Sequence, residues 1–295
     1  MDTQILSGKV VSASVYKGLK SRIVKLKTNS ITPCLAVVLI GDDAPSHVYV
    51  KNKTKKFASL NLNSETIKLT NETSENALLE IINNLNNDNK YHGILVQLPL
   101  PNHINNETII NAIDPKKDVD GFNPVNLGRL AAGRPSFIPC TPKGIMRVFE
   151  YYKIDLSNKH VVVVGRSNIV GRPISILTSL KRKYSNATTT ICHSGTKNIS
   201  YFTKQADIVI LALGFPEYLK GNDIKEGAIV IDVGINRVKS ETKTGYKLLG
   251  DCEFSSINGK ASCISPVPGG IGPMTIAMLV ENTIEAAEKS ANFAL

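Results

Sequence analysis

Short apolar runs alternate with segments of helical periodicity along most of the chain. Uninterrupted apolar runs of this length are typical of strands buried on both faces, because a strand with one wet face alternates apolar and polar residues. Such strands separated by helices predict an α/β fold with a parallel sheet covered on both sides. The expected strands are residues 34–40, 93–98, 160–164, 188–191, 207–213 and 228–233.

Two helices have clear sequence signals. A helix is expected to open at Ser46, whose hydroxyl could accept a hydrogen bond from a backbone N–H of the first turn. A long helical stretch over residues 274–291 follows a loop rich in Gly and Pro. The pattern therefore predicts helices both early in the chain and at its end.

The organisation predicts two α/β domains, which 295 residues are enough to build. Residues 116–142 have many Gly, Pro and Asn residues and weak periodicity, which is typical of a crossing between domains. We expect a first domain over residues 1–140 and a Rossmann-like domain over residues 141–273, with a cleft between them. The last segment, residues 274–295, is expected to pack back on the first domain.

Composition narrows the class of protein. The chain is 42% hydrophobic and 20% charged, which is typical of a globular protein. No run approaches the roughly 20 apolar residues of a membrane helix, and the first residues do not resemble a secretory signal. The five cysteines are widely spaced without a C-x-x-C pair, which predicts reduced thiols, no metal site and a cytoplasmic location.

The formal net charge of +10 leaves three interpretations open: nucleic-acid binding, a solvated Lys-rich surface, or a basic cleft for anionic small molecules. Nucleic-acid binding is disfavoured because Trp is absent and the basic residues lack interleaved aromatic residues. Charge alone does not choose between the other two.

Residues 160–173 form a strand, a glycine turn and a helix start. Gly165 permits a tight turn, Gly171 permits close packing at the helix entrance, and Pro173 suits a first helical turn. Such a turn can bind phosphate through backbone N–H groups and the positive end of the helix. The spacing G-x-x-x-x-x-G differs from the G-x-G-x-x-G fingerprint, so a plain α/β turn remains the alternative.

The choice of cofactor leaves a trace in the charges. NAD-specific folds place an acidic residue about 20 residues beyond the glycine turn. Residues 156–206 contain no Asp or Glu but eight Lys or Arg residues, so NADP is favoured over NAD, with a basic surface as the alternative. Arg166, Ser194 and Lys197 could bind the additional phosphate. His193 is interpreted as a structural or surface residue rather than a catalytic one.

The first half of the chain contains candidate catalytic groups. Tyr49 and Lys53 lie one helical turn apart on the same face, where a phenol and an ammonium could orient a heterocycle and move a proton. A solvated Lys-rich helix face is the alternative. Gln97 ends a buried strand, residues 117–122 form an acidic turn, and residues 266–275 form a loop that exposes its backbone to a flat ligand.

Taken together, these segments closely resemble the bifunctional methylenetetrahydrofolate dehydrogenase/methenyltetrahydrofolate cyclohydrolase family. The resemblance covers nearly the whole chain, the motifs occur in the family's order, and none departs from the family's pattern. The motifs are Y-V-x-x-K, G-I-L-V-Q-L-P-L-P, K-D-V-D-G-F, V-V-G-R-S-x-I-V-G-x-P, G-A-I-V-I-D-V-G-I-N and P-V-P-G-G-I-G-P-M-T.

The resemblance implies specific roles. Lys53 would be the catalytic lysine, Tyr49 would stack on the pterin, Gln97 would place Lys53, and Asp120 would bind the amino-pyrimidine edge. The remaining substrate-binding residues would be Val96, Leu98, Pro268, Gly269 and Gly270. The cofactor-binding residues would be Gly165, Arg166, Ser167, Ser194 and Ile235, with Ile235 near the nicotinamide.

The activity implied is NADP-dependent oxidation of methylene-tetrahydrofolate and hydrolysis of the resulting methenyl cation, in one-carbon metabolism and purine biosynthesis. It needs no metal, and Lys53 would move the proton in the hydrolysis. The expected partners are a folate substrate and a second copy of the chain, with no nucleic acid and no membrane. Two rival enzymes are a dehydrogenase of the same fold without hydrolase activity and a shikimate-type dehydrogenase; the N-terminal half lacks the paired Lys and Asp pattern of the latter.

Overall fold

The computed structural model describes residues 2–241 and 245–291, which fall into two compact units. Unit 1 comprises Met1–Val15 and Thr141–Ala277, and unit 2 comprises Tyr16–Cys140 and Met278–Leu295. The divisions fall within two long helices, α1 (Gly8–Thr28) and α10 (Gly272–Ser290), and at the start of α6 (Cys140–Tyr151). The first fifteen residues thus belong to the unit that contains the predicted dinucleotide domain.

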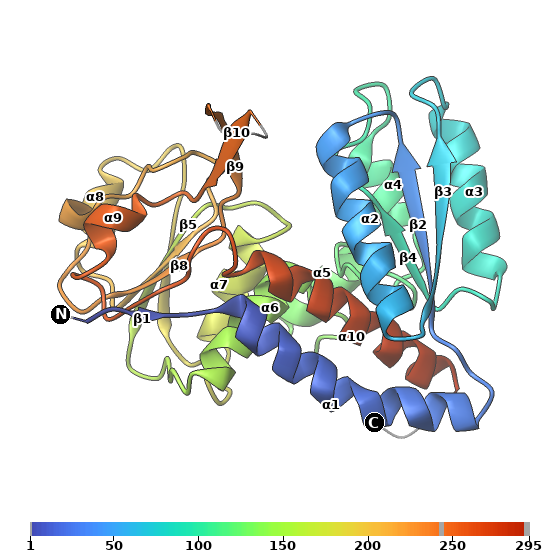
Figure 1. Cartoon of the computed structure of the whole chain (residues 1–295), viewed down its shortest axis with the longest axis horizontal. Coiled ribbons are helices and arrows are strands. Elements are labelled where there is room, and N and C mark those ends of the chain that lie inside the picture. Colours follow the sequence, from blue (N-terminus) through green and yellow to red (C-terminus); the bar gives the residue numbers. More distant parts are fainter. Residues whose placement is uncertain (1, 242–244, 292–295) are drawn as a thin grey trace. The chain divides into compact units, whose positions relative to one another are not determined.

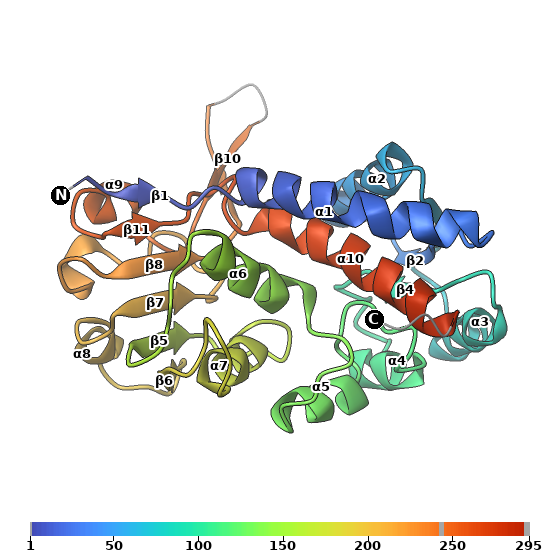
Figure 2. The same ribbon diagram turned by 90° about the horizontal axis from the view of Figure 1, so that it is seen from below.

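Unit 1 is built on a six-stranded parallel sheet, as Figure 2 shows. Its strands, in spatial order, are β1 (Gln4–Ile5), β11 (Cys263–Ile264), β8 (Ile229–Asp232), β7 (Ile208–Leu211), β5 (His160–Val164) and β6 (Thr188–Cys192). Along the chain, β5 pairs with β6 on one side and β7 on the other, so the strand order reverses at β5. In open α/β sheets, ligands bind at the carboxyl ends of strands beside such a reversal.

Short helices and a hairpin complete unit 1. The helical elements after α6 are α7 (Gly171–Ser179), α8 (Ile199–Thr203), the 3₁₀-helix η1 (Gly221–Asp223) and α9 (Phe254–Ile257). The antiparallel pair β9 (Asn236–Lys239) and β10 (Tyr246–Leu249) leaves the sheet after β8. Buried residues of β5, β7 and β8 share one apolar core, which explains their continuous apolar runs.

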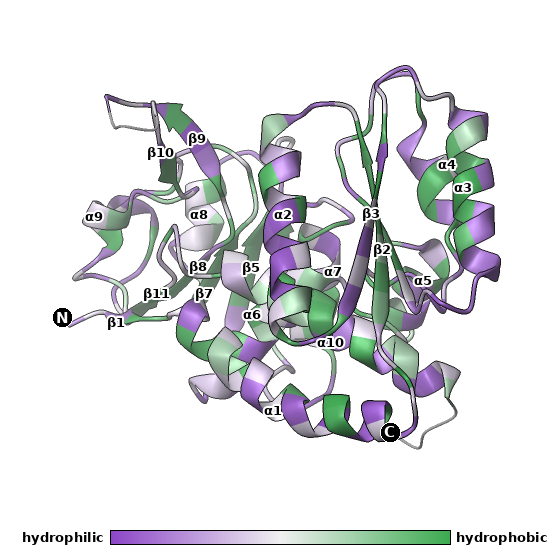
Figure 3. Cartoon of the chain, turned by 45° about the vertical axis from the view of Figure 1, so that its right-hand side comes forward, coloured by the Kyte–Doolittle hydropathy of each residue, from purple (hydrophilic) through white to green (hydrophobic). Residues whose placement is uncertain are grey.

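Unit 2 contains a three-stranded parallel sheet with β2 (Cys34–Ile40) between β3 (Asn63–Leu69) and β4 (Gly93–Val96). All seven residues of β2 are buried, whereas the edge strand β3 is largely hydrophilic, as Figure 3 shows. Helix α2 covers one face of the sheet, and helices α3 and α4 cover the other, where their buried residues share a core with β2 (Figure 2). These helices, labelled in Figure 1, are α2 (Ala44–Ser59), α3 (Glu75–Asn87) and α4 (Asn106–Ala112).

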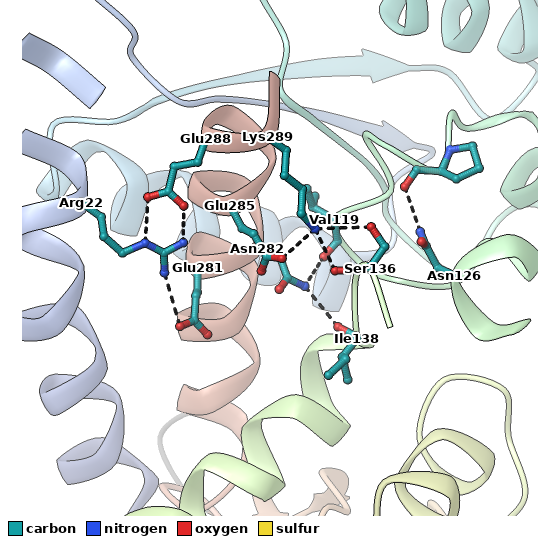
Figure 4. Close-up of polar contacts among 11 residues, drawn as sticks. Arg22, Val119, Asn126, Ser136, Ile138, Glu281, Asn282, Glu285, Glu288 and Lys289 are labelled. Atoms are coloured by element: carbon teal, nitrogen blue, oxygen red, sulfur yellow. Dashed lines mark hydrogen bonds and ion pairs between the residues drawn. The ribbon is translucent and has the colours of Figure 1, made fainter. Parts of the chain in front are cut away.

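The C-terminal half of α10 is fastened to unit 2 by polar contacts (Figure 4). The guanidinium of Arg22 on α1 donates to both carboxylate oxygens of Glu288. Asn282, fully buried, donates through Nδ2 to the carbonyl oxygens of Val119 at 2.8 Å and Ile138 at 3.1 Å. Because buried polar groups are costly without partners, these contacts fix the helix against the loops around residues 119 and 138.

Two local predictions need correction. The helix expected to open at Ser46 begins at Ala44, because the carboxylate of Asp43 caps it by accepting from the backbone N–H of Ser46 at 2.9 Å. The crossing expected over residues 116–142 is less irregular than predicted. It contains the helix α5 (Pro124–Ala131), capped by Asn123, whose side chain accepts from the N–H of Val125.

The expected strands over residues 93–98, 207–213 and 228–233 continue too far, since β4, β7 and β8 stop one or two residues earlier. Their last apolar residues belong to loops at the carboxyl edge of each sheet. All five cysteines are buried and form no disulfide, as predicted. Within the described part of the chain, no helix is long and apolar enough to cross a membrane.

Candidate functional site

Lys53 lies on the inner face of α2. The buried residues of this helix are Ser46, Val50, Lys53 and Phe57, which follow the spacing of a single helix face. Lys53 is only 7% exposed, although lysine is almost never this buried unless it has a partner. Tyr49, one turn earlier, is half-buried. The solvated-face alternative is therefore wrong for Lys53.

The partner of Lys53 comes from the carboxyl edge of the sheet in unit 2. Gln97 follows β4 directly, and its backbone N–H donates to the carbonyl of Val38 at 2.9 Å. Its side-chain Nε2 donates to the carbonyl of Leu98 at 2.7 Å, which leaves Oε1 as an acceptor. The ammonium of Lys53 donates to this Oε1 at 3.0 Å. Two of the four predicted catalytic residues, Lys53 and Gln97, are thus in direct contact.

The acidic turn runs beside β4. The backbone N–H of Ile94 donates to the carbonyl of Lys117 at 2.8 Å, and Ile94 and Asp118 form an isolated parallel bridge. The segment therefore extends the edge of the sheet by one isolated β-bridge. Asp120 lies two residues after the bridged Asp118 and therefore at the same carboxyl edge as Gln97, as expected for residues that follow parallel strands.

Asp118 and Asp120 have different surroundings. Asp118 is buried, and its carboxylate accepts from the backbone N–H groups of Gly121, Phe122 and Asn123 and from Nδ2 of Asn126. Asp118 therefore holds the turn together. Burial raises the pKa of Asp120, while the nearby Lys53 ammonium and a hydrogen bond with Cys140 oppose this rise.

Two further residues support this cluster, and the sequence interpretation missed both. Cys140 contacts Asp120, and its thiol also donates to the carbonyl of Val119 at 3.4 Å. Asn282 lies 3.7 Å from the Cys140 sulfur. The cysteine was interpreted only as a buried thiol, and no spacing signal connects residue 282 to residue 140.

In unit 1, the glycine turn after β5 is tightly packed. Gly165 has φ +131°, and a Cβ there would lie 2.3 Å from the carbonyl oxygen of Ala212. A Cβ on Gly171, at the start of α7, would lie 2.2 Å from the carbonyl oxygen of Gly165. Side chains are therefore excluded at both glycines, and the backbone between β5 and α7 stays close to the strand ends, as a phosphate cradle requires.

The polar residues around this turn have distinct positions. The hydroxyl of Ser167 accepts from the N–H of Val170 at 3.1 Å and of Gly171 at 3.4 Å, so it shapes the turn itself. Arg166 and Ser194 are exposed at the ends of the adjacent strands β5 and β6. His193 accepts from the N–H of Gly195 at 3.0 Å through Nδ1, a contact that orders the loop after β6.

The other predicted residues of unit 1 lie on two loops. Ile235 follows β8 and is 43% exposed. Residues 268–270 precede α10, and the N–H of Lys9 donates to the carbonyl of Gly269 at 3.3 Å. A Cβ on Gly8 would lie 1.6 Å from the carbonyl oxygen of Gly270, so the start of α1 packs directly on this loop.

The predicted residues thus form two groups, each within one unit. Tyr49, Lys53, Gln97 and Asp120 belong to unit 2 with Val96 and Leu98, while the cofactor residues and residues 268–270 belong to unit 1. A hollow of about 320 Å³ lined by Cys34, Glu65 and Lys90 lies at the amino ends of β2 and β3 and includes none of them. Among residues 2–241 and 245–291, no group of three or more His, Cys, Asp or Glu residues could hold a metal ion.

Comparisons with known proteins identify the family of the chain. The catalytic-domain model of tetrahydrofolate dehydrogenase/cyclohydrolase matches residues 6–120, and the NAD(P)-binding-domain model of the same enzymes matches residues 139–291. The chain is 49% identical over 291 residues to the bifunctional protein FolD of Acetivibrio thermocellus, covering 99% of each.

Solved structures are similar over the same length. A FolD dehydrogenase/cyclohydrolase from Campylobacter jejuni is 45% identical, with a TM-score of 0.92 and coverage of 98% of this chain and 99% of that one. The Trypanosoma brucei enzyme, solved with NADP and an inhibitor, is 33% identical, with a TM-score of 0.93 and 99% coverage of both chains. The chain therefore belongs to the tetrahydrofolate dehydrogenase/cyclohydrolase family.

Proposed function

We propose that the protein oxidises methylene-tetrahydrofolate to methenyl-tetrahydrofolate with NADP and then hydrolyses the product to formyl-tetrahydrofolate. The observation that carries this proposal is the buried ammonium of Lys53, which donates to Gln97 and lies near Asp120. A family with both activities, matched along both halves of the chain, supports it. The product would serve one-carbon metabolism, including purine biosynthesis.

NADP fits the residues of unit 1. The glycine turn between β5 and α7 leaves no room for a Cβ at Gly165 or Gly171, so its backbone can approach a pyrophosphate. Arg166 and Ser194 would bind the ribose phosphate, since no carboxylate among residues 156–206 would repel it. Ser167 would complete the phosphate turn, and Ile235 would lie against the nicotinamide.

When bound, NADP would supply the acceptor for the hydride that leaves the methylene bridge of the folate. The residues of this chain would act mainly on the hydrolysis, in which a water molecule adds to the methenyl carbon and the bond from that carbon to one folate nitrogen breaks. One proton of the water goes to this nitrogen, and the other leaves to solvent. Lys53 would move the proton to the nitrogen, because its Nζ is held in one position by Gln97 at 3.0 Å and is shielded from bulk water. Gln97 would act through Lys53.

The folate would be bound by groups around Lys53. Asp120 would accept hydrogen bonds from the amino-pyrimidine edge, and Tyr49 would stack on the pterin ring. Val96 and Leu98 flank Gln97 and would contact the ring. In unit 1, Pro268, Gly269 and Gly270 would contact the folate from the loop before α10, although the expected exposure of this backbone is not observed at Gly270, which is buried and whose N–H donates to the carbonyl of Pro266.

We also propose a cytoplasmic homodimer that binds neither nucleic acid nor membrane. The absence of interleaved aromatic residues among the Lys and Arg residues supports the first exclusion. The positive charge suits NADP and the poly-glutamate tails of folates at least as well as it suits nucleic acid.

The test is a pair of assays on one preparation. Cofactor reduction is followed with methylene-tetrahydrofolate and either NADP or NAD, and hydrolysis of methenyl-tetrahydrofolate is followed without cofactor. We expect both reactions, with NADP preferred. Oxidation without hydrolysis would reduce the proposal to a monofunctional dehydrogenase, and the absence of oxidation with either cofactor would overturn it.

A further inference from the structure

Two carboxylates are buried at the carboxyl edge of the six-stranded sheet in unit 1. Asp232 ends β8 and is 1% exposed, and Asp251 follows β10 and is fully buried. Burial raises the pKa of Asp232, and the charge of Asp251 raises it further, while hydrogen bonds from Asp251 and Cys252 oppose the rise. Buried acids of this kind are costly, so their presence calls for a specific role.

Asp251 accepts four hydrogen bonds from two loops. Its Oδ2 accepts from the backbone N–H of Leu213 at 2.7 Å and of Gly214 at 3.1 Å. Its Oδ1 accepts from the N–H of Phe215 at 3.0 Å and from Nδ2 of Asn236 at 2.9 Å. One side chain therefore joins the loop after β7 to the segment after β8.

Asp232 holds Asp251 in place. Its Oδ1 accepts from the backbone N–H groups of Gly234 and Asp251, both at 2.9 Å, and its Oδ2 accepts from the N–H of Cys252 at 2.8 Å. A Cβ on Gly234 would lie 2.2 Å from Oδ1 of Asp251, and one on Gly250 would lie 2.0 Å from Oδ2 of Asp232. The backbone is thus packed directly against both carboxylates.

These loops flank the point at which the strand order reverses. The loop after β7 begins at Ala212, whose carbonyl oxygen lies against Gly165 of the glycine turn. The segment after β8 contains Ile235, between two residues that the carboxylates hold. The loop after β7 and the segment after β8 therefore both border the edge where a dinucleotide binds in open α/β sheets.

We propose that Asp251, held by Asp232, is a positioning residue that sets the loops of residues 213–215 and 234–236 in the shape that binds NADP; this rests on the proposed use of NADP at this edge. Asp251 touches neither cofactor nor substrate and acts through the backbone. Asparagine cannot replace it, because the amide nitrogen would face two of the four donors whichever way the amide lies.

The experiment compares Asp251→Asn with Asp207→Asn. Asp207 lies just before β7, at its opposite end, and accepts from the N–H of His160 and from Lys225. The dissociation constant of NADPH is measured by its fluorescence, and both reactions are assayed. Hydrogen bonds to charged groups contribute about 1.5–3 kcal/mol, so we expect the dissociation constant of Asp251→Asn to rise about 10- to 100-fold. Hydrolysis of methenyl-tetrahydrofolate without cofactor should stay within about twofold of wild type, and Asp207→Asn should behave as wild type in all three measurements.

A dissociation constant that rises less than about threefold would overturn the proposal, since one lost donor contact should exceed that. An equal loss of both activities would also overturn it, because Asp251 would then be merely structural. Should Asp251→Asn fail to fold, Asn236→Ala removes a single donor, and an unchanged dissociation constant for that variant would count against the proposal equally. Failure of the wild type to bind NADPH would instead contradict the proposed function.

Discussion

The carboxyl edges of the two parallel sheets share a framework but differ in the side chains that they present. Each sheet reverses its strand order, at β2 in unit 2 and at β5 in unit 1, and each places its candidate residues on the loops that follow. Each edge also buries a carboxylate that accepts several N–H groups, Asp118 in one unit and Asp251 in the other. The framework of the two edges is therefore alike.

The two edges differ in the candidate side chains that lie beyond this framework. In unit 2, a cluster of ionisable and polar side chains lies beyond this framework: the buried Lys53 and the partly exposed Gln97 and Asp120. In unit 1, the predicted contacts at the edge are glycine backbone, hydroxyls, an exposed guanidinium and an aliphatic side chain. This contrast assigns proton movement to unit 2 and binding geometry to unit 1, because general acid–base catalysis needs titratable groups whereas phosphate binding needs donors and space.

The strongest test of this division is Lys53→Met. Removal of the ammonium should lower hydrolysis of methenyl-tetrahydrofolate by about 10²- to 10⁴-fold, the usual contribution of a positioned acid–base group. Part of the dehydrogenase activity should survive, since hydride transfer needs no proton from Lys53. Both rates are measured on one preparation, with Lys55→Met, an exposed lysine of the same helix, as the matched control. Normal hydrolysis by Lys53→Met would remove this residue from the mechanism.

Ser194→Asp tests the other edge. A carboxylate beside the ribose phosphate of NADP would repel it, so we expect the preference for NADP over NAD to fall by about 100-fold, while hydrolysis of methenyl-tetrahydrofolate is unchanged. The ratio of kcat/KM with the two cofactors is the measurement. Ser194→Ala separates the lost hydroxyl from the added charge, and Ser179→Asp, at the far end of α7, is the control. An unaltered ratio in Ser194→Asp would place the phosphate elsewhere.

The sequence predicted the architecture well because buried parallel strands have a strong signal. Residues 34–40 and 160–164 are strands with the predicted bounds, since every residue of the first and nearly every residue of the second is buried. Strand ends were less accurate: the apolar residues that follow β7 and β8 pack in loops and are indistinguishable from strand residues in the sequence. The start of α2 was also misplaced, because Asp43 and Ser46 are both good capping residues.

The candidate site was predicted mainly from the family resemblance, since the residues alone left a solvated Lys-rich helix face as the alternative for Lys53. Lys53 occupies a position on the inner face of α2 that the spacing from Val50 to Phe57 marks as apolar. The supporting contacts had no such signal. Asp251 lies 38 residues from Leu213, to whose N–H it is hydrogen-bonded, and nothing local in the sequence announces a tertiary contact of this kind.

Asp120→Asn should have an intermediate effect on activity. Loss of a charged acceptor for the pterin should lower kcat/KM for both reactions by about 10- to 100-fold. Because burial raises the pKa of Asp120, although Lys53 opposes the rise, the wild-type enzyme should lose folate binding as the pH falls through a value above that of a free aspartate. The pH profile of kcat/KM for hydrolysis is the measurement. If the acidic limb of this profile persists unchanged in Asp120→Asn, the limb reports the titration of another residue.

Asp118→Asn should have the smallest effect on activity and the clearest effect on stability. In Asp118→Asn an amide nitrogen must face two of the four donors that the carboxylate now satisfies, which should lower the free energy of unfolding by about 1–3 kcal/mol. Asp120→Asn should not be destabilised at neutral pH. Because the pKa of Asp120 is raised in the folded protein, its protonated form favours folding. This contribution to stability is complete below the pKa that Asp120 has in the unfolded chain, and it is lost as the pH rises through the pKa that Asp120 has in the folded protein.

Urea unfolding of the two variants at neutral pH measures this contrast directly. Asp118→Asn should be less stable than wild type yet retain most of its activity when folded, whereas Asp120→Asn should be as stable as wild type and poorly active. The neutral amide at residue 120 removes a charge that holds no turn, while that at residue 118 removes an acceptor from the backbone N–H of Phe122 or of Asn123. The reverse order of stability would mean that Asp120 holds the turn and that Asp118 is the carboxylate left for the substrate.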